Sequence, residues 1–118
     1  MTQYNATIKG NTPSKSNCYM IAHKRLIKTK RLKDYEESFY IQLPPELRNI
    51  DITSYFEFYV DVFYPSQRAD LDNSLKIILD CLQKTKTIRN DNKCVKIVAQ
   101  KALDKENPRI QFTIKPIE

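Results

Sequence analysis

Four charged side chains in the second half of the chain have the types and spacing that phosphodiester chemistry uses. Asp70 and Asp72 stand two residues apart at the start of a helical pattern, with Lys76 four residues after Asp72; Asp91 comes shortly before a later strand pattern. Carboxylates without histidine or thiolate form an all-oxygen site, which selects Mg²⁺, with Mn²⁺ as a substitute. A lysine beside them stabilises charge on phosphorus or on the departing oxygen. We expect Asp70, Asp72 and Asp91 to be metal ligands and, together with Lys76, catalytic residues.

An ordinary structural role explains part of the same pattern. Acids near a helix N-terminus are stabilised by the helix dipole, and Asp72 with Lys76 makes a surface pair at i,i+4 spacing. Asp72 or Asn73 suits the N-cap position, which places Asp70 before the cap and leaves its carboxylate without a capping role. The segment between the helix and Asp91 must be nearly extended if Asp91 is to reach Asp72. A carboxylate from a partner subunit is therefore the alternative third ligand.

Hydrophobic patterns predict the elements that must position these residues. Alternation predicts strands at 4–9, 39–43, 55–65, 95–101 and 109–115. One helical turn is expected at 45–49, and the basic stretch 21–38 fits a helix or a loop that orders on binding. In the helix that carries Asp72, the buried stripe consists of Leu71, Leu75, Ile78, Leu79 and Leu82. Residues 1–118 are therefore predicted to form one compact α/β (α+β) domain, with a mixed or mostly antiparallel sheet and a central amphipathic helix.

Basic residues are concentrated at the start of the chain. Residues 1–33 contain eight Lys or Arg and no Asp or Glu, so this segment accounts for the whole net charge of +6. Such segregation favours a polyanion, and nucleic acid fits better than a membrane surface because the segment has a thin apolar face and no Trp or Phe anchors. The DNA contacts expected from this segment are Lys24, Arg25, Lys28, Lys30 and Arg31.

Several other classes of site are excluded or disfavoured by composition. Gly10 is the one glycine, so a Gly-rich phosphate loop is excluded, and position 75, where a calcium-binding EF-hand needs glycine, is Leu75. His23 is the one histidine and no CxxC pair is present, which argues against zinc and a Ser-His-Asp triad. Three cysteines, no long apolar run and no signal-peptide pattern predict a cytoplasmic protein with reduced thiols and no membrane span.

Five segments, taken in chain order, match a known family. They are "IKGNTPSKSN", "FYPSQRADLDNSLKIILDCL", "NDNKCV", Lys101 and "RIQFTIKP". Over nearly the whole chain they resemble the RusA family of Holliday-junction resolvases. The resemblance implies a homodimer that binds a four-way DNA junction and cuts it by Mg²⁺-dependent paired nicking, with Asp70, Asp72 and Asp91 as essential acids and Lys76 as essential lysine. It also suggests a second set of DNA contacts, Lys15, Asn17, Arg68, Asn73 and Lys101.

One departure from the family pattern keeps other functions open. The family has two adjacent acids ahead of the strand, whereas here Asp91 is followed by Asn92. The alternative to a resolvase is a catalytically impaired protein that binds junction or duplex DNA. A third possibility is a small domain whose basic segment contacts an acidic protein. Cleavage of a junction separates the first two, and preference for a junction over linear duplex separates both from the third.

Overall fold

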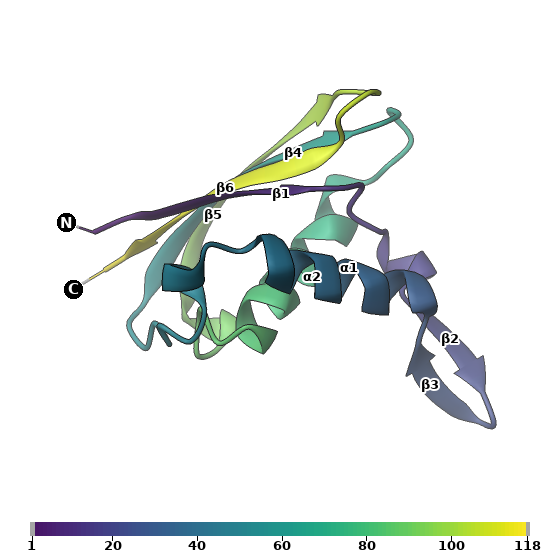
Figure 1. Ribbon diagram of the computed structural model, residues 1–118, viewed down its shortest axis with the longest axis horizontal. Helices are drawn as coiled ribbons and strands as arrows, with labels where there is room; N and C mark the ends of the chain where they lie inside the picture. Colours follow the sequence, from purple (N-terminus) through teal and green to yellow (C-terminus); the bar gives the residue numbers. More distant parts are fainter. Residues whose placement is uncertain (1, 118) are drawn as a thin grey trace.

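A four-stranded mixed sheet with two helices on one face makes up most of the computed structural model, which describes residues 2–117 (Figure 1). The strands are β1 (Tyr4–Lys9), β6 (Arg109–Pro116), β4 (Phe56–Tyr64) and β5 (Cys94–Leu103), in that spatial order. β6 is antiparallel to both β1 and β4, whereas β4 and β5 are parallel. The predicted α+β class with a mixed sheet is confirmed.

The central strand β4 follows the alternation that its sequence predicts. Phe56, Phe58, Val60, Val62 and Tyr64 are buried, and the residues between them are partly exposed. Because successive side chains of a strand point to opposite faces, the buried set lies under the helices and the other set faces the open side. The strands predicted at 4–9, 95–101 and 109–115 are likewise confirmed as β1, β5 and β6.

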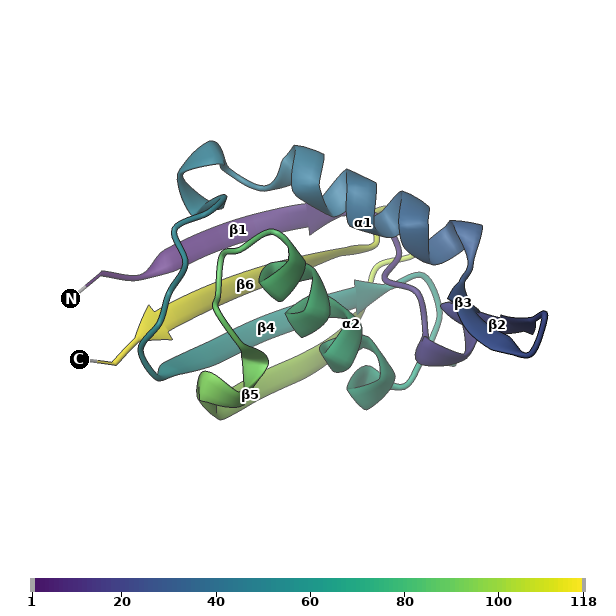
Figure 2. The ribbon, with the colours of Figure 1, turned by 90° about the horizontal axis from the view of Figure 1, so that it is seen from below.

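Helix α2 (Leu71–Lys84) connects the two parallel strands, which cannot be joined by a tight turn. Figure 2 shows it crossing the sheet face beside α1. Its inward side consists of Ser74, Ile77, Ile78, Leu79, Cys81 and Leu82. The predicted stripe is confirmed at Ile78, Leu79 and Leu82, while Leu71 and Leu75 are partly exposed at the N-terminal end. The predicted central amphipathic helix is thus present and begins beside the expected acids.

The strand predicted at 39–43 is wrong, because residues 39–42 are the last turn of helix α1 (Lys30–Gln42). Thr29 caps this helix by accepting a hydrogen bond from the Leu32 backbone N–H at 3.3 Å. Phe39 is fully buried and stacks on Phe112 of β6, with ring centroids 6.3 Å apart. The alternation in "FYIQL" is too short to specify a strand. The packing of Phe39 against the sheet stabilises a helix at these residues instead. The helical turn expected at 45–49 is present at Pro45–Leu47.

The basic stretch contains a β-hairpin that neither sequence expectation included. β2 (Tyr19–Ala22) and β3 (Arg25–Lys28) form a separate two-stranded sheet that projects away from the main body (Figure 1). His23 and Lys24 connect them with positive φ angles of 52° and 62°. Two central residues with positive φ match the twist of a two-residue hairpin, although such turns usually use Asn or Gly. The local sequence therefore contains no ordinary hairpin signal.

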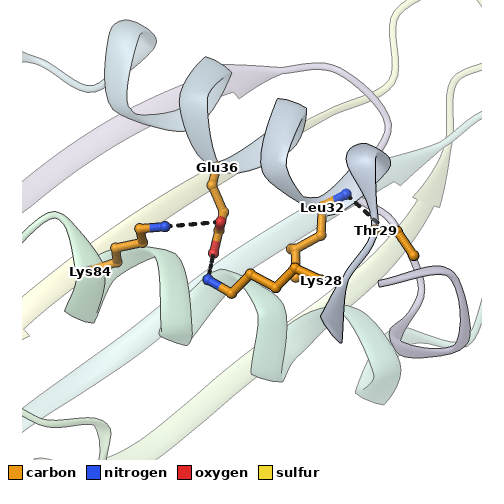
Figure 3. A network of polar contacts seen from close by, with 5 residues as sticks. All are labelled: Lys28, Thr29, Leu32, Glu36 and Lys84. Carbon is orange, nitrogen blue, oxygen red and sulfur yellow. Dashed lines mark hydrogen bonds and ion pairs between the residues drawn. The ribbon is translucent and has the colours of Figure 1, made fainter. Parts of the chain in front are cut away.

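An ion-pair bridge holds the hairpin and the two helices together. The Glu36 carboxylate of α1 accepts hydrogen bonds from Lys28 of β3 at 2.8 Å and from Lys84 of α2 at 3.0 Å (Figure 3). Burial raises the pKa of Glu36, but the hydrogen bonds from the two lysines outweigh burial and lower the pKa overall. Glu36 therefore stays ionised and connects three elements that are distant in sequence.

Within residues 2–117, no helix is both long enough and apolar enough to cross a membrane.

Candidate active site

Asp70 and Asp72 lie at the N-terminal end of α2. Asp70 is the N-cap residue, with an extended backbone (φ −93°, ψ 125°), and Asp72 lies in the first turn. The cap predicted at Asp72 or Asn73 is therefore wrong, because the helix already begins at Leu71. The Asp70 side chain nevertheless makes no capping hydrogen bond, and its Oδ2 accepts only a long one from Asn73 Nδ2, at 3.4 Å. Both carboxylates are on exposed residues and are available to a ligand.

Tyr64 of β4 contacts the N-terminal part of α2 from the sheet side. It ends β4, is almost fully buried, and donates a hydrogen bond from its hydroxyl to Ser74 Oγ of α2 at 2.5 Å. Burial raises the pKa of Tyr64, and the negative charges of Asp70 and Asp72 raise it further. Tyr64 therefore stays neutral as a hydrogen-bond donor close to both acids. The sequence pattern identified it only as a strand residue.

Lys76 is held between two further carboxylates. Its Nζ lies 2.5 Å from Asp91 Oδ2 and 3.1 Å from Asp80 Oδ1. The hydrogen bond to Asp91, and then that to Asp80, raises the pKa of Lys76, so the side chain remains a cation. Asp91 opens the 3₁₀ turn η3 (Asp91–Lys93), and its backbone N–H donates to Gln83 Oε1 of α2 at 3.0 Å. The chain after α2 thus returns to the helix and brings Asp91 to the predicted lysine.

One chain does not bring the three predicted metal ligands together. Among residues 2–117, no group of three or more His, Cys, Asp or Glu side chains is placed to hold a metal ion. Asp70 and Asp72 share the start of α2, whereas Asp91 lies at Lys76, further along the helix. The oxygen donors suit a hard divalent cation by chemical type. A single subunit presents them as a pair plus one separate acid.

A hollow of about 320 Å³ opens beside the acid pair. It lies where the N-terminal segment, the start of α1 and the start of α2 meet. The predicted site residues that line it are Asn17, Arg31, Arg68, Asp70 and Asn73. The structure therefore gathers two arginines and one of the acids from three separate segments around one depression.

The hollow also contains two serines that were not among the predicted site residues, although both lie in the segment "IKGNTPSKSN" that resembles the family. Ser14 and Ser16 line it, and their hydroxyl oxygens are 3.0 Å apart. Asn17 Nδ2 donates to Ser14 Oγ at 3.1 Å. These short polar side chains suit hydrogen bonding to phosphate oxygens. The "PSKSN" segment was the available signal, and Lys15 and Asn17 were the residues selected from it.

The remaining predicted DNA contacts lie outside the hollow. Lys24 occupies the tip of the β2–β3 hairpin and Arg25 begins β3. Lys15 lies in the 3₁₀ turn η1 (Lys15–Asn17). Lys101 of β5 donates to the Gln67 carbonyl at 2.7 Å and so supports the loop that leads to Asp70.

Lys28 and Lys30 are engaged in ion pairs within the chain. Lys28 pairs with Glu36, and Lys30 pairs with Asp34 at 2.8 Å. Lys28 also lines a larger cavity of about 470 Å³ between α1 and α2, together with Glu36 and Lys84. That cavity is lined by none of the four predicted catalytic residues. Lys28 is thus less available to DNA than the sequence alone suggests, whereas Lys30 stays exposed and its surface ion pair is weak.

Comparison with known protein families gives one match that spans nearly the whole chain. The family model described as Endodeoxyribonuclease RusA matches residues 9–115, which include the acid pair, the lysine, Asp91 and most of the basic segment. No curated protein matches the chain. Because the family match spans nearly the whole chain, the chain belongs to the RusA family of endodeoxyribonucleases, which resolve Holliday junctions.

Proposed function

We propose that this chain is a Mg²⁺-dependent Holliday-junction resolvase that acts in the cytoplasm as a homodimer and nicks two strands of like polarity. Enzymes of this family bind branched DNA and depend on a divalent metal in general. The observation that carries the proposal is the exposed pair Asp70 and Asp72 beside a hollow lined by Arg31 and Arg68. Acids that would repel a phosphate are useful there only if a cation accompanies the DNA.

Each side chain of this site has a distinct part in phosphodiester hydrolysis. Arg31 and Arg68 attract and orient the DNA phosphate through charge-assisted hydrogen bonds. Asp70 and Asp72 would hold Mg²⁺, or Mn²⁺ in its place, which supplies charge neutralisation at phosphorus and a more acidic water. The Lys76 ammonium, oriented by its carboxylate partners, stabilises charge on the oxygen that departs when the phosphorus–oxygen bond breaks.

A homodimer suits the proposed reaction because a four-way junction presents two equivalent strands. Two sites related by a two-fold axis cut them symmetrically. The basic surface around η1 and the hairpin would then supply the salt-dependent part of the binding free energy.

The direct test removes the charge of the acid pair. Asp70→Asn and Asp72→Asn are each expected to lower nicking of a synthetic four-way junction by about 100-fold or more. Junction affinity in a gel-shift assay should stay equal or increase, because a negative charge near DNA is lost. Asp61→Asn, on the open face of the sheet, is the matched control and should nick normally. If both active-site variants cut at the wild-type rate, the metal assignment is wrong.

Junction binding without cleavage is the second candidate function. Two observations favour it. Asp91 contacts Lys76 instead of the acid pair, and Asn92 stands where the family has a second acid. A wild-type protein that binds the junction but leaves every strand intact in Mg²⁺ and in Mn²⁺ would establish it.

A further inference from the structure

The β2–β3 hairpin is fixed at its base and projects from the main body (Figure 1). At the base, the Thr29 N–H donates to the Cys18 carbonyl at 2.9 Å, and Cys18 is fully buried. The Thr29 hydroxyl donates to the Asn17 carbonyl at 2.7 Å. The ion pair of Lys28 with Glu36 adds a contact to α1. These contacts set the direction in which the hairpin points.

Large apolar side chains are exposed on both faces of this hairpin. Ile21 lies opposite Leu26, and Met20 lies opposite Ile27, with exposed fractions of 37–79% for the four residues. Because neighbouring residues of a strand point to opposite faces, each face carries one of these pairs. A ribbon that packs on a single surface needs apolar residues on one face only. The pattern therefore favours a partner that offers apolar surface on both sides of the hairpin.

The charges of the hairpin indicate the chemical class of that partner. Lys24 lies at the turn and Arg25 begins β3, and neither takes part in the ion pairs described for residues 2–117. Residues 1–33 contain no Asp or Glu. Cations beside exposed apolar side chains suit nucleic acid, in which anionic phosphates surround the flat apolar faces of the bases.

The apolar pairs lie within reach of DNA that is bound at the acid pair. Asn17 lines the hollow beside Asp70, and Ile21 follows Asn17 by four residues. Four residues span at most about 14 Å. Successive bases of a strand are about 3.4 Å apart, so this distance corresponds to about four base pairs or fewer. A strand bound in the hollow therefore brings its neighbouring bases to the hairpin.

The thickness of the hairpin favours a branch point over a continuous duplex. A ribbon with large side chains on both faces is about 10 Å thick, by analogy with the spacing of packed sheets. The stacked base pairs of a duplex leave no gap of that size. Where the arms of a branched DNA meet, stacking is interrupted and the last base pair of an arm can expose one face. Inserting apolar side chains there costs less unstacking free energy than in an intact duplex.

We propose that the hairpin is a wedge that inserts at the branch point of a four-way junction, where its two apolar pairs pack on exposed base faces. The wedge distinguishes a junction from linear duplex, and it holds the branch point next to the acid pair. The inference rests on the proposed function, because that function brings a junction to this site. Apolar wedges of Leu, Ile or Met are an established way for proteins to open a base step.

Binding of a threonine variant tests the wedge directly. Ile21→Thr combined with Leu26→Thr removes one apolar pair and keeps residues that favour a strand and pair well across it. Affinity is measured in a chelator, for a four-way junction and for a linear duplex. Junction affinity should fall by about tenfold, as expected when base stacking is lost. Duplex affinity and the salt dependence should stay unchanged, because no cation is removed.

Two further variants control for the loss of any exposed isoleucine and for damage to the hairpin. Ile41→Thr on α1, where Ile41 is 64% exposed, should leave the preference for the junction unchanged. Ile21→Val combined with Leu26→Met keeps the apolar character and should keep the preference as well. A threonine variant with the wild-type preference would overturn the wedge and assign the apolar side chains to another partner. An equal loss for the apolar variant would also overturn it.

A fluorescent base reports insertion without reference to affinity. 2-Aminopurine at a base that borders the branch point emits more strongly when it is unstacked. Saturating wild-type protein should raise this emission, and the saturated threonine variant should raise it much less. The same probe in the middle of an arm should not respond. An equal increase at the branch point for both proteins would contradict insertion.

These measurements use no metal, so their outcome is independent of cleavage. A wild type that prefers the junction but cuts it in neither Mg²⁺ nor Mn²⁺ would overturn the resolvase proposal and leave the wedge. A threonine variant that retains the preference, with an active wild type, would overturn the wedge and leave the resolvase proposal.

Discussion

At the scale of single residues, the charged groups of the site differ in how firmly the fold holds them. Asp70 and Asp72 have no strong partner, whereas Lys76 is oriented by two carboxylates. The preorganised Lys76 ammonium suits stabilisation of the charge that develops on the departing oxygen. The loosely held carboxylates of Asp70 and Asp72 can adjust their positions when they bind a metal ion. Tyr64 supplies the rigid support, since its hydroxyl links β4 to the first turns of α2.

The clearest prediction at this scale concerns Glu36, which lies outside the active site. Its pKa is lowered by Lys28 and Lys84, so its stabilising effect is present above the unfolded-state pKa and disappears as the pH falls through the lower folded-state value. Glu36→Gln should lower the free energy of unfolding by about 0.5–1 kcal/mol at neutral pH, measured by urea denaturation. The difference should shrink as the pH falls below the ordinary carboxyl value of 4.5.

The neighbouring residue provides a control for that measurement. Glu37 is exposed and belongs to no ion pair described between residues 2 and 117. Glu37→Gln should therefore leave the unfolding free energy and its pH dependence almost unchanged. A Glu36→Gln difference that stays constant down to acidic pH would show that the ion-pair bridge contributes nothing to stability.

At the scale of elements, the β2–β3 hairpin is the most unusual part of the fold. It projects from the body and exposes Ile21 and Leu26, which lie opposite each other across the two strands, with exposed fractions of 79% and 70%. Lys24 and Arg25 lie at its tip, and Arg31 follows at the start of α1. Among the ion pairs described for residues 2–117, none involves these three cations, so they remain available to phosphate.

Replacing these three cations tests the hairpin as a DNA-binding element. The combined Lys24→Ala, Arg25→Ala and Arg31→Ala variant should flatten the dependence of log K on log salt by about 2–3 units, because each phosphate contact releases a counterion. The measurement is junction binding at several salt concentrations. Lys96→Ala and Lys115→Ala together remove two positive charges from the open face of the sheet, where both lysines lie over Tyr59, and should leave the slope unchanged. Equal slopes for the triple and the double variant would rule out a role for the hairpin.

At the scale of the whole molecule, an aromatic cluster joins the helices to the sheet. Phe112 of β6 stacks on Phe39 of α1 and lies 5.9 Å, centroid to centroid, from Phe58 of β4. All three rings are almost fully buried. This cluster determines where α1 lies on the sheet, and through α1 it sets the position of the basic segment relative to the acid pair.

Truncating the central ring of the cluster should destabilise the whole fold. Phe112→Ala is expected to lower the free energy of unfolding by about 3–5 kcal/mol, because a cavity remains where helix and sheet meet. Urea denaturation followed by circular dichroism measures the loss. Phe63→Ala, on the open face beneath Arg109, should cost far less. Equal losses for both variants would contradict the assignment of the core to the helix side.

The features that depend on local spacing follow from the amino-acid sequence alone. Alternation specified β1, β4, β5 and β6, the helical period specified α2, and the intervals between Asp70, Asp72 and Lys76 identified the candidate chemistry. These predictions succeed because the side-chain periods of strand and helix are properties of the backbone itself. Family resemblance then extended the local pattern to a function.

The features that depend on contacts between distant segments follow from the three-dimensional fold and not from local patterns. It placed residues 39–42 in a helix because Phe39 packs on Phe112, and it folded the basic stretch into a hairpin attached through Glu36. It also brought Asp91 to Lys76 rather than to the acid pair, and left β5 as a free edge. Such outcomes depend on which surfaces compete for burial and pairing, and no short stretch of sequence contains that information.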